Sequence, residues 1–493
     1  MTTTTSVGAV DLRHYVGGRW EEGGAGPLVS TNPARPDEIV AAGREATAAD
    51  VDRSVSAARA AARAWARTPV HERGAILIRA AAGLEAEAAP LGRELAREEG
   101  KTLAEGTGEV LRAAQILRYY GNEGDRVAGE VFASPRRGER ILVTRKPLGV
   151  VGVITPFNFP IAIPAWKIAP ALVYGNTVVW KPSGVVPLLA VRLTEALADA
   201  GLPEGVLNLV IGAGELGTAI VNHPGIDGIT FTGSTTIGRR IAAAGAGCGV
   251  PVQAEMGGKN AAVVLADADL DLAAEQVLFG AFRSTGQKCT ATSRLILQDA
   301  VADEFLDRLR ARLDDWIVGD PTDPSVHMGP VVSETARRDI RAGVSRSLAE
   351  GATLLIGDQD VPESGYFVPA TVLELPSDPV RAAANTAWSE EFFGPVLSVR
   401  RAADAASAFA LVDESEFGLS ASVFTQDVTR ALDAVEDIDV GILHINSESA
   451  GADPHVPFGG AKKSGYGPKE QGGAAKEFFT HTTTVYLRGG TPA

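Results

Sequence analysis

The residues VVGVITPFNFPIAIPAWKIAPALVYGNTVVWK, numbered 150–181, decide the fold of this chain. They begin and end with short runs rich in β-branched residues, VVGVI at 150–154 and NTVVW at 176–180, which are typical of strands. The apolar segment between the runs is interrupted by prolines and a lysine, so we interpret it as a buried core segment and not as a membrane span. Two strands separated in this way indicate an α/β arrangement.

The same alternation continues on both sides of this stretch. Helical patterns, for example over 187–200, fit between the strand-like runs, and the pattern starts again after Gly257. Strands interleaved with helices imply parallel pairing, so we predict an α/β chain with two doubly wound domains and a ligand-binding cleft between them. The other strand-like runs are ILVTRK (141–146), VLNLVI (206–211), GITF (228–231), AAVVL (261–265), RLIL (294–297), ATLLIG (352–357), VLSVR (396–400), ASVF (421–424) and GILHIN (441–446).

The first third of the chain is predicted to be helical. Thr47 with Asp50 resembles a helix N-cap followed by an acidic first turn, and Pro69 ends that helix. A second helical pattern follows Pro69. A third helix begins at Thr102, where Glu105 three residues later completes a capping box.

The composition is that of a folded globular protein. The 493 residues, of 51.2 kDa, are 45% hydrophobic and 22% charged, which excludes a disordered chain. The net charge of −15 argues against nucleic acid and anionic membranes as partners. With only two cysteines, a disulfide framework is excluded and a reducing compartment is expected. The start of the chain lacks the layout of a signal peptide, so we predict a soluble cytoplasmic protein.

Cys289, in FRSTGQKCTATSR at 282–294, is the candidate nucleophile. Its neighbours are small and polar, and a thiol beside Lys288 and backbone N–H groups is expected to lose its proton more easily. The alternative is a buried cysteine that packs as a small hydrophobic residue. For Cys248, in AGAGCGVP, no polar partner is near in sequence and this alternative is preferred.

Two polar residues at the ends of strand-like runs are candidate partners of the thiol. Glu255, in QAEMGGKN at 253–260, can work as a general base if it is partly desolvated. Asn158, in ITPFNFP at 154–160, lies in a turn pinned by two prolines and can point amide donors into a cavity, as an oxyanion hole requires. The alternatives are a solvated turn carboxylate and an asparagine that only closes its turn.

Two glycine-rich loops are candidates for binding a dinucleotide. GAGELG at 212–217 matches G-x-G-x-x-G after a strand-like run, but Thr232 stands where an acidic residue is expected. FTGSTTIGRR at 231–240 also follows a strand-like run, and Gly233 and Ser234 open a helix whose N–H groups can bind a pyrophosphate. The seven histidines show no metal-ligand spacing, and neither a serine-hydrolase elbow nor a P-loop is present, so no metal is predicted.

Taken together and in this order, the motifs resemble the NAD(P)-dependent aldehyde dehydrogenase superfamily, nearest to its α-ketoglutaric semialdehyde and succinic semialdehyde dehydrogenase-like members. The resemblance covers nearly the whole chain. The matching motifs are TPFNFP (155–160), YGNTVVWKPS (174–183), FTGSTTIG (231–238), AEMGGKN (254–260), STGQKC (284–289), EEFFGPV (390–396) and PFGGAKKSGYG (457–467).

The resemblance implies a division of the chain into three parts. Residues 1–126 and 148–256 would form the dinucleotide-binding domain, and 257–472 the catalytic domain. Residues 127–147 and 473–493 would form a small β flap for oligomerisation. The strand-like tail TTTVYLR (482–488), which has no local partner, would extend the sheet of a neighbouring subunit. A homo-oligomer, dimer or tetramer, is therefore expected.

The resemblance also implies roles for the candidate residues. Cys289 would attack the aldehyde carbon to form a thiohemiacetal, while the Asn158 amide and the Cys289 N–H hold the oxyanion. Hydride transfer to the nicotinamide would leave a thioester, and Glu255 would activate the water that hydrolyses it. Lys167 and Glu470 are expected to form a proton relay.

NAD(P)⁺ is the implied cofactor. The loop 231–238 would face its pyrophosphate, with GAGELG as a flanking turn. Many NAD-preferring relatives carry an acid three residues after the Lys181 position, where this chain has Gly184, so NADP⁺ is predicted to be accepted, with a lean toward it. The implied cofactor residues are Thr155, Pro156, Phe157, Lys181, Ser183, Gly184, Gly214, Gly233, Ser234, Gly257, Glu391 and Phe393.

The expected substrate is an aldehyde with a distal carboxylate, of the 2,5-dioxopentanoate or succinic semialdehyde type. Arg283, six residues before Cys289, matches an arginine that holds the substrate carboxylate in succinic semialdehyde dehydrogenases. The second arginine of that subfamily would fall near Trp166, which is aromatic here, and the segment 444–472 resembles α-ketoglutaric semialdehyde dehydrogenases more closely. A structural salt bridge is the alternative role for Arg283.

Three other functions stay open at this point. Trp166 and Phe157 are expected to line an aromatic pocket if the substrate is of the benzaldehyde or vanillin type. A thioesterase or a non-catalytic scaffold on the same fold is a further alternative. A CoA-acylating enzyme is disfavoured, because its relatives do not usually carry a glutamate at the position of Glu255.

Overall fold

Residues 150–181 fold as predicted, into a strand, a helix and a second strand. In the computed structural model, which describes residues 8–490, these are β8 (Val150–Ile154), α5 (Ala162–Val173) and β9 (Thr177–Lys181). The two strands pair in parallel, with Ile154 opposite Lys181, and every residue of α5 is buried. The apolar segment is therefore a core helix, and the ends of both strands open at the same edge of the sheet.

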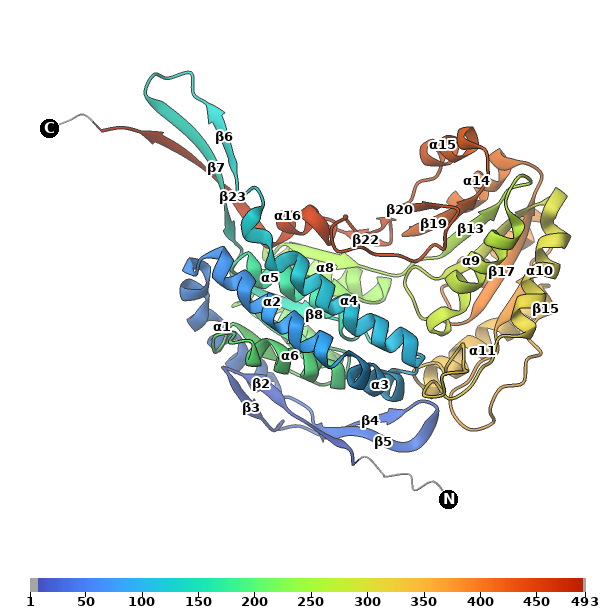
Figure 1. Ribbon diagram of the computed structural model, residues 1–493, viewed down its shortest axis with the longest axis horizontal. Helices are drawn as coiled ribbons and strands as arrows, with labels where there is room; N and C mark the ends of the chain where they lie inside the picture. Colours follow the sequence, from blue (N-terminus) through green and yellow to red (C-terminus); the bar gives the residue numbers. More distant parts are fainter. Residues whose placement is uncertain (1–7, 491–493) are drawn as a thin grey trace.

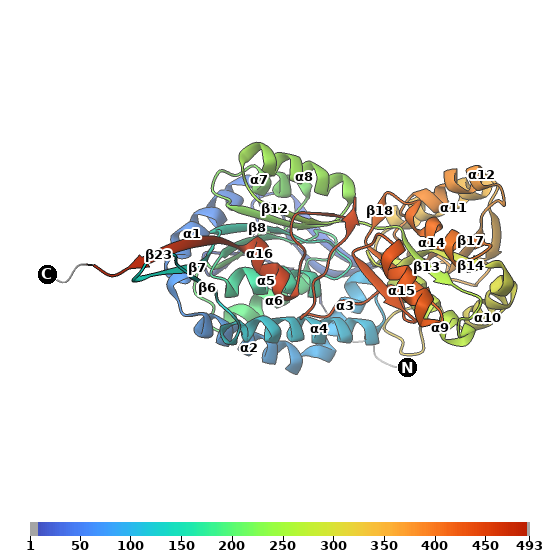
Figure 2. The same cartoon turned by 90° about the horizontal axis from the view of Figure 1, so that it is seen from above.

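An eight-stranded sheet surrounds this unit, in the order β22-β12-β11-β8-β9-β10-β2-β3. Helices α7 and α8 cover one face, and α2, α4 and α5 cover the other (Figure 2). The other strands are β2 (His14–Val16), β3 (Arg19–Glu21), β10 (Leu207–Leu209), β11 (Gly228–Thr232), β12 (Val252–Glu255) and β22 (Gly465–Tyr466). The helices of this lobe are α1 (Ala48–Arg67), α2 (Val70–Ala86), α3 (Ala88–Glu99), α4 (Leu103–Gly121), η1 (Glu123–Asp125), α6 (Leu188–Asp199), α7 (Gly214–Val221) and α8 (Thr235–Cys248).

The start of the chain differs from the prediction. The N-caps Thr47 and Thr102 are confirmed, each with a complete capping box. Before them, however, the chain forms strands, so the prediction of a wholly helical first third was wrong. Three of these strands make a separate sheet, β1 (Val10–Leu12), β4 (Pro27–Asn32) and β5 (Arg35–Arg44).

The second lobe contains a seven-stranded sheet in the order β15-β16-β17-β14-β13-β19-β20, parallel except for β15. Its strands are β13 (Asn260–Val264), β14 (Thr292–Gln298), β15 (Thr353–Ile356), β16 (Thr371–Glu374), β17 (Val396–Ala402), β19 (Ser420–Phe424) and β20 (Ile442–Ile445). The helices are α9 (Leu270–Phe282), η2 (Arg283–Gly286), η3 (Asp299–Val301), α10 (Ala302–Asp314), α11 (Glu334–Ala349), α12 (Pro379–Ala384), α13 (Thr386–Ser389), α14 (Ala405–Asp413) and α15 (Val428–Asp437). Two doubly wound α/β lobes are thus confirmed (Figure 1).

A three-stranded antiparallel sheet projects from the first lobe (Figure 1). It consists of β6 (Glu130–Ala133), β7 (Glu139–Pro147) and β23 (Thr480–Arg488), in the order β23-β7-β6. The tail strand, which has no partner close to it in sequence, pairs with β7 from Thr480 opposite Pro147 to Arg488 opposite Glu139. The extension of a neighbouring subunit's sheet by this strand stays a prediction, as do the domain boundaries.

The last segment of the chain returns from the second lobe to the first. β18 (Phe417–Gly418) pairs with β21 (Ala461–Lys462), and β22 then pairs with β12, which places Gly465 opposite Glu255. After it come η4 (Gly472–Ala474) and α16 (Ala475–Phe479). Both lobes therefore contribute to the space between them.

Candidate active site

A cavity of about 290 Å³ lies between the lobes. Helix α4, helix α5, the segment before Cys289 and the loop around 448–458 form its walls. The lining includes Cys289, Trp166, Arg283 and Phe458. This is the only cysteine on the wall, because Cys248 lies at the exposed end of α8.

Cys289 follows a segment with strained backbone. Ser284 and Thr285, in η2, have φ angles of 53° and 55°, in the left-handed region that residues with a Cβ rarely adopt. A Cβ on Gly286 would come within 2.3 Å of the Gly394 carbonyl oxygen, so this loop is packed against the segment that precedes β17. Strain of this kind persists where surrounding structure fixes it, and it is common at functional sites.

The environment of Cys289 favours the neutral thiol. Burial raises the pKa of Cys289 to about 12, and the negative charges of Glu391 and Glu255 add to the effect. The ammonium of Lys288 donates to the Phe279 carbonyl at 3.0 Å and lies 3.4 Å from Glu448. The prediction that Lys288 lowers the pKa of this thiol was therefore wrong.

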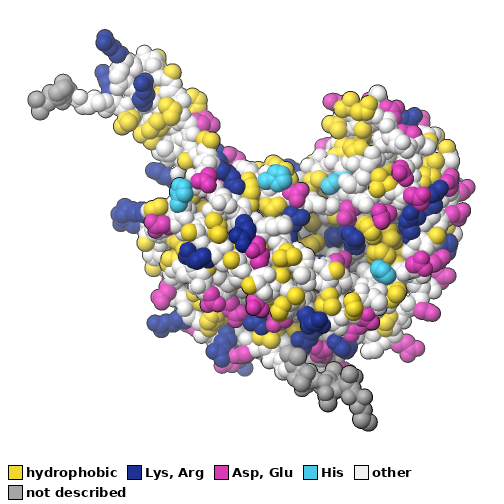
Figure 3. Space-filling model, viewed as in Figure 1, with side chains coloured by type: hydrophobic (Ala, Val, Ile, Leu, Met, Phe, Trp, Pro, Cys, Tyr) yellow, Lys and Arg dark blue, Asp and Glu magenta, His cyan; other side chains and the backbone are white. Residues whose placement is uncertain are grey.

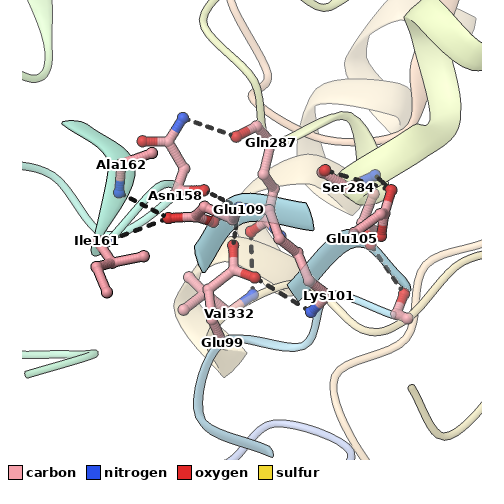
Figure 4. Close-up of polar contacts among 12 residues, drawn as sticks. Glu99, Lys101, Glu105, Glu109, Asn158, Ile161, Ala162, Ser284, Gln287 and Val332 are labelled. Atoms are coloured by element: carbon pink, nitrogen blue, oxygen red, sulfur yellow. Dashed lines mark hydrogen bonds and ion pairs between the residues drawn. The ribbon is translucent and has the colours of Figure 1, made fainter. Parts of the chain in front are cut away.

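Asn158 lies beside the cysteine loop. Its side chain is 2% exposed, and its Nδ2 donates to the Gln287 carbonyl oxygen at 2.9 Å (Figure 4). One N–H of the amide is thus held by the residue two before Cys289. The role of this amide in an oxyanion hole stays a prediction.

Glu255, at the end of β12, is buried with a second carboxylate behind it. Its Oε2 accepts from the Gly460 N–H at 3.2 Å. Burial raises the pKa of Glu255 well above its usual value, and repulsion from Glu470 acts in the same direction against the attraction of Lys167. Lys167 forms a buried ion pair with Glu470 and donates to Thr230 Oγ1 at 2.9 Å. The structure brings the three together, and the proton relay stays a prediction.

A second cavity, of about 520 Å³, opens at the carboxyl ends of β8, β9 and β11. Ser234 is the N-cap of α8 and makes no side-chain capping bond, so the first N–H groups of that helix remain free for a ligand. Both glycine-rich loops contribute to this one cavity. Eight of the predicted cofactor residues line it: Thr155, Pro156, Phe157, Lys181, Ser183, Gly214, Gly233 and Ser234.

The remaining predicted cofactor residues do not line this cavity: Gly184, Gly257, Glu391 and Phe393. Glu391 Oε1 accepts from the Gly258 N–H at 3.0 Å, and a Cβ on Gly257 would come within 2.0 Å of the same carboxylate. Phe393 packs edge-on against Phe157, with ring centroids 5.7 Å apart.

The structure separates the aromatic residues that were assigned to the substrate. Trp166 lines the cavity of Cys289 and packs on Phe458, with ring centroids 5.5 Å apart. Phe157 lines the second cavity instead, and its part in an aromatic aldehyde pocket stays a prediction.

Arg283 lies on the wall of the same cavity and is exposed. Its guanidinium stacks 3.5 Å above the Phe279 ring. Between residues 8 and 490 it forms no salt bridge, so the structural salt bridge considered for it was wrong.

Sequence reasoning missed a charged face of helix α4 on the cavity wall. The residues are Lys101, just before the helix, with Glu105, Glu109 and Arg112. Their spacing of three or four residues in KTLAEGTGEVLR would have placed them on one side of a helix. Arg240, on α8, is a further missed residue in the cofactor cavity.

None of the helices within residues 8–490 is long and apolar enough to cross a membrane. In the same range, no cluster of three or more His, Cys, Asp or Glu side chains is arranged to hold a metal ion.

The comparisons with known proteins agree with this geometry. The chain matches the aldehyde dehydrogenase family over residues 20–485. It is 42% identical to the alpha-ketoglutaric semialdehyde dehydrogenase of Bacillus subtilis (strain 168), over 96% of this chain and 98% of that protein. It is 40% identical to the 2,5-dioxopentanoate dehydrogenase of Saccharolobus solfataricus, over 95% and 98%.

The fold is equally well matched among solved structures. The NAD-dependent aldehyde dehydrogenase of Sinorhizobium meliloti superposes with a TM-score of 0.94 at 32% identity, over 98% of this chain and 96% of that one. The chain therefore belongs to the aldehyde dehydrogenase family. It is an oxidoreductase that oxidises aldehydes.

Proposed function

We propose that this enzyme oxidises a semialdehyde with a distal carboxylate, of the 2,5-dioxopentanoate or succinic semialdehyde type, to the dicarboxylic acid. The observation that carries the proposal is Arg283, an exposed guanidinium without a salt bridge among residues 8–490, on the wall of the cavity that holds Cys289. A guanidinium binds a carboxylate through two parallel hydrogen bonds. Two relatives of this chain are named for that substrate class.

In the proposed mechanism, Glu255 first takes the proton of the Cys289 thiol. Burial raises the pKa of this carboxylate, so in its ionised form it accepts a proton more readily than a solvated carboxylate does. The sulfur then bonds to the aldehyde carbon, and the carbonyl oxygen becomes an oxyanion facing Asn158 Nδ2 and the Cys289 N–H. A bound nicotinamide ring would supply the acceptor for the hydride that leaves that carbon.

The residue left on the enzyme is a thioester on Cys289. Glu255, after losing its proton, takes one from water, and the hydroxide attacks the thioester carbon. The carbon–sulfur bond breaks, the acid leaves, and the sulfur regains a proton. The buried Lys167–Glu470 pair behind Glu255 is the proposed route by which the proton departs.

For the cofactor, we propose NAD(P)⁺, with NADP⁺ accepted and favoured. The residues that would hold it line the second cavity, where α8 offers free N–H groups to a pyrophosphate. No carboxylate stands at Gly184, and two cations, Lys181 and Arg240, line the same cavity. A 2′-phosphate would meet attraction there in place of repulsion.

The proposed substrate class is tested by replacing Arg283. Arg283→Ala should lower kcat/KM for succinic semialdehyde or 2,5-dioxopentanoate by about 10- to 100-fold, mostly through KM, because a charge-assisted pair contributes about 1.5–3 kcal/mol. Arg283→Lys keeps the charge and should lose less. Butanal, which has no carboxylate, is the matched control substrate and should be oxidised equally by all three proteins.

Three results would count against this function. An unchanged KM for the semialdehyde acids would remove the anchor role of Arg283. A higher kcat/KM for vanillin or benzaldehyde would favour an aromatic aldehyde dehydrogenase. Hydrolysis of p-nitrophenyl acetate without NAD(P)H formation from any aldehyde would favour a thioesterase.

A further inference from the structure

The first turns of helix α4 contact two loops that are far apart in sequence. One loop, 158–162, precedes α5 and carries Asn158; the other, 284–287, precedes Cys289. Lys101, Glu105 and Glu109 reach these loops from one side of the helix (Figure 4). The resulting cluster lies on the wall of the cavity that holds Cys289.

The contacts to the first loop come from a buried ion pair. Lys101 Nζ lies 2.8 Å from Glu109 Oε2, and both side chains are 2% exposed. The same ammonium donates to the backbone carbonyl oxygen of Asn158. The other carboxylate oxygen of Glu109 accepts from the N–H groups of Ile161 and Ala162, at 3.1 and 3.2 Å. The pair thus holds the backbone on both sides of the turn that aims Asn158.

The contacts to the second loop come from Glu105. Its Oε1 accepts from the Ser284 N–H at 2.7 Å, at the start of the left-handed segment. Gln287 joins the two loops, because its carbonyl accepts from Asn158 Nδ2 and its own amide oxygen accepts from the Val332 N–H at 3.0 Å. The loop that carries the Asn158 amide and the loop that precedes Cys289 are therefore both held by the start of helix α4.

Such a pair is poorly explained by stability alone. Removing two charges from water costs several kcal/mol, and replacing a buried ion pair with well-packed apolar residues is often neutral or stabilising. Lys101 also packs 3.8 Å above the Phe159 ring, so a site for an apolar side chain is already present. What an apolar pair could not do is direct a donor at Asn158 and an acceptor at Ile161 and Ala162.

We propose that Lys101 and Glu109 are positioning residues, which fix the Asn158 amide at the place where the oxyanion forms. The inference rests on the proposed function, because it assigns the pair to the step in which Cys289 adds to the aldehyde. Neither residue touches the reacting atoms. Their effect on turnover passes through the Asn158 side chain.

The first test is Lys101→Met, which keeps the side-chain length and removes the donor. The rate of the NAD(P)H burst, per active site titrated by burst amplitude, should fall by about 10- to 100-fold, in line with the cost of a misplaced catalytic group. KM should change by less than kcat. A residue that only stabilises the fold would lower the melting temperature and the number of active sites, and leave the rate per site unchanged.

Because Lys101→Met leaves two buried carboxylates, those of Glu109 and Glu99, without their cation, a second variant guards against misfolding. Lys101→Met/Glu109→Gln removes both charges of the pair. The amide oxygen introduced at position 109 can still accept from the N–H groups of Ile161 and Ala162. This double variant should fold and show the same slow burst. Arg118→Met, which breaks the exposed Arg118–Glu85 pair on the same helix, is the matched control and should keep the rate of the original enzyme.

A double-mutant cycle separates positioning from other effects. If Lys101 acts through the Asn158 amide, Lys101→Met should cost less than about threefold when added to Asn158→Ala, because contacting residues are non-additive. A full further loss in the Asn158→Ala background would overturn the inference, as would an unchanged burst rate in both Lys101 variants. If the unmodified enzyme oxidises no aldehyde at all, the proposed function fails. This result differs from an active enzyme whose Lys101 variants keep the burst rate, in which case only the positioning role fails.

Discussion

Cys289 and Glu255 are both buried, and burial raises the pKa of the thiol and of the carboxyl alike. Burial, with the nearby carboxylates, raises the pKa of the thiol to about 12, and burial also raises the pKa of Glu391 to about 7. Below about pH 7, Glu391 is therefore uncharged and repels a thiolate little. Above it, the carboxylate is charged and opposes ionisation of the sulfur.

This gives a prediction for alkylation of Cys289 by iodoacetamide in the enzyme without cofactor, measured by mass spectrometry in a Cys248→Ser background. The rate should rise about tenfold per pH unit from about pH 7 to 9, because the thiolate fraction does so below the raised pKa. Glu391→Gln keeps an acceptor for Gly258 and removes the charge. It should speed alkylation more at about pH 8.5 than at about pH 6.

The outcome that would contradict this charge assignment is a rate independent of pH over that range, which would mean that the thiol is already ionised. An equal effect of Glu391→Gln at both pH values would show that its carboxylate does not act on the sulfur.

At the scale of single residues, the candidate catalytic residues could be predicted from the sequence. Cys289, Glu255 and Asn158 each stand in a short motif, and the structure brings them to one place. Lys101 and Glu109 were missed because their contacts span 57 and 52 residues, to Asn158 and Ile161. A single lysine or glutamate in a helical pattern is normally a solvated residue, and the spacing that puts these two on one side of a helix does not show that they are buried.

Elements with a strong local period were predicted well, and elements that depend on distant partners were not. The strands and helices from β8 onward follow hydrophobic runs and caps that the sequence displays. The missed strands near the start pair across the molecule, as when Tyr15 lies opposite Leu209. Strands of three residues, such as β2 and β3, have no period to detect.

The loop after β9 carries the prediction for cofactor choice. Gly184→Glu should move the kcat/KM ratio from NADP⁺ toward NAD⁺, because the new carboxylate repels a 2′-phosphate. A Cβ at this position would lie 3.1 Å from the Gly212 carbonyl oxygen, so the loop must shift by a few tenths of an ångström. Gly184→Ala also adds a Cβ and requires the same shift of the loop, but it adds no charge, so it is the matched control. Arg240→Ala should weaken NADP⁺ more than NAD⁺.

A strong preference of the original enzyme for NAD⁺ would show that the missing acid at Gly184 does not decide the cofactor. The same conclusion would follow if Gly184→Ala changed the ratio as much as Gly184→Glu.

At the scale of the whole molecule, the projecting sheet is a part of the structure whose hydrophobic side chains remain exposed in a single chain. Four of its hydrophobic side chains are exposed, Val131, Phe132, Tyr486 and Leu487, and hydrophobic groups are visible on this sheet in Figure 3. The outer edge of β23 has no strand partner within residues 8–490. An exposed apolar sheet with a free edge is a surface that a second copy of the chain can cover.

We therefore expect a chain that ends after Phe479 to be a monomer by light scattering, while a chain that ends after Arg488 keeps the assembly of the full-length protein. Tyr486→Lys/Leu487→Lys keeps the strand and should weaken the assembly as well. Val380→Lys alters an exposed side chain on α12 and is the control. If the chain that ends after Phe479 and the lysine pair both retain the full-length mass, the sheet does not hold the oligomer together.

The pairing of β22 with β12 has a consequence for biosynthesis. The strand that presents Glu255 is completed on its outer side by Gly465 and Tyr466, and the ion pair behind it needs Glu470. While the ribosome is still making the second lobe, the first lobe is already translated, but β12 has only its inner neighbour β11 and lacks the outer strand β22. A nascent chain can therefore be folded over much of its length and still inert toward aldehydes until residue 470 has emerged.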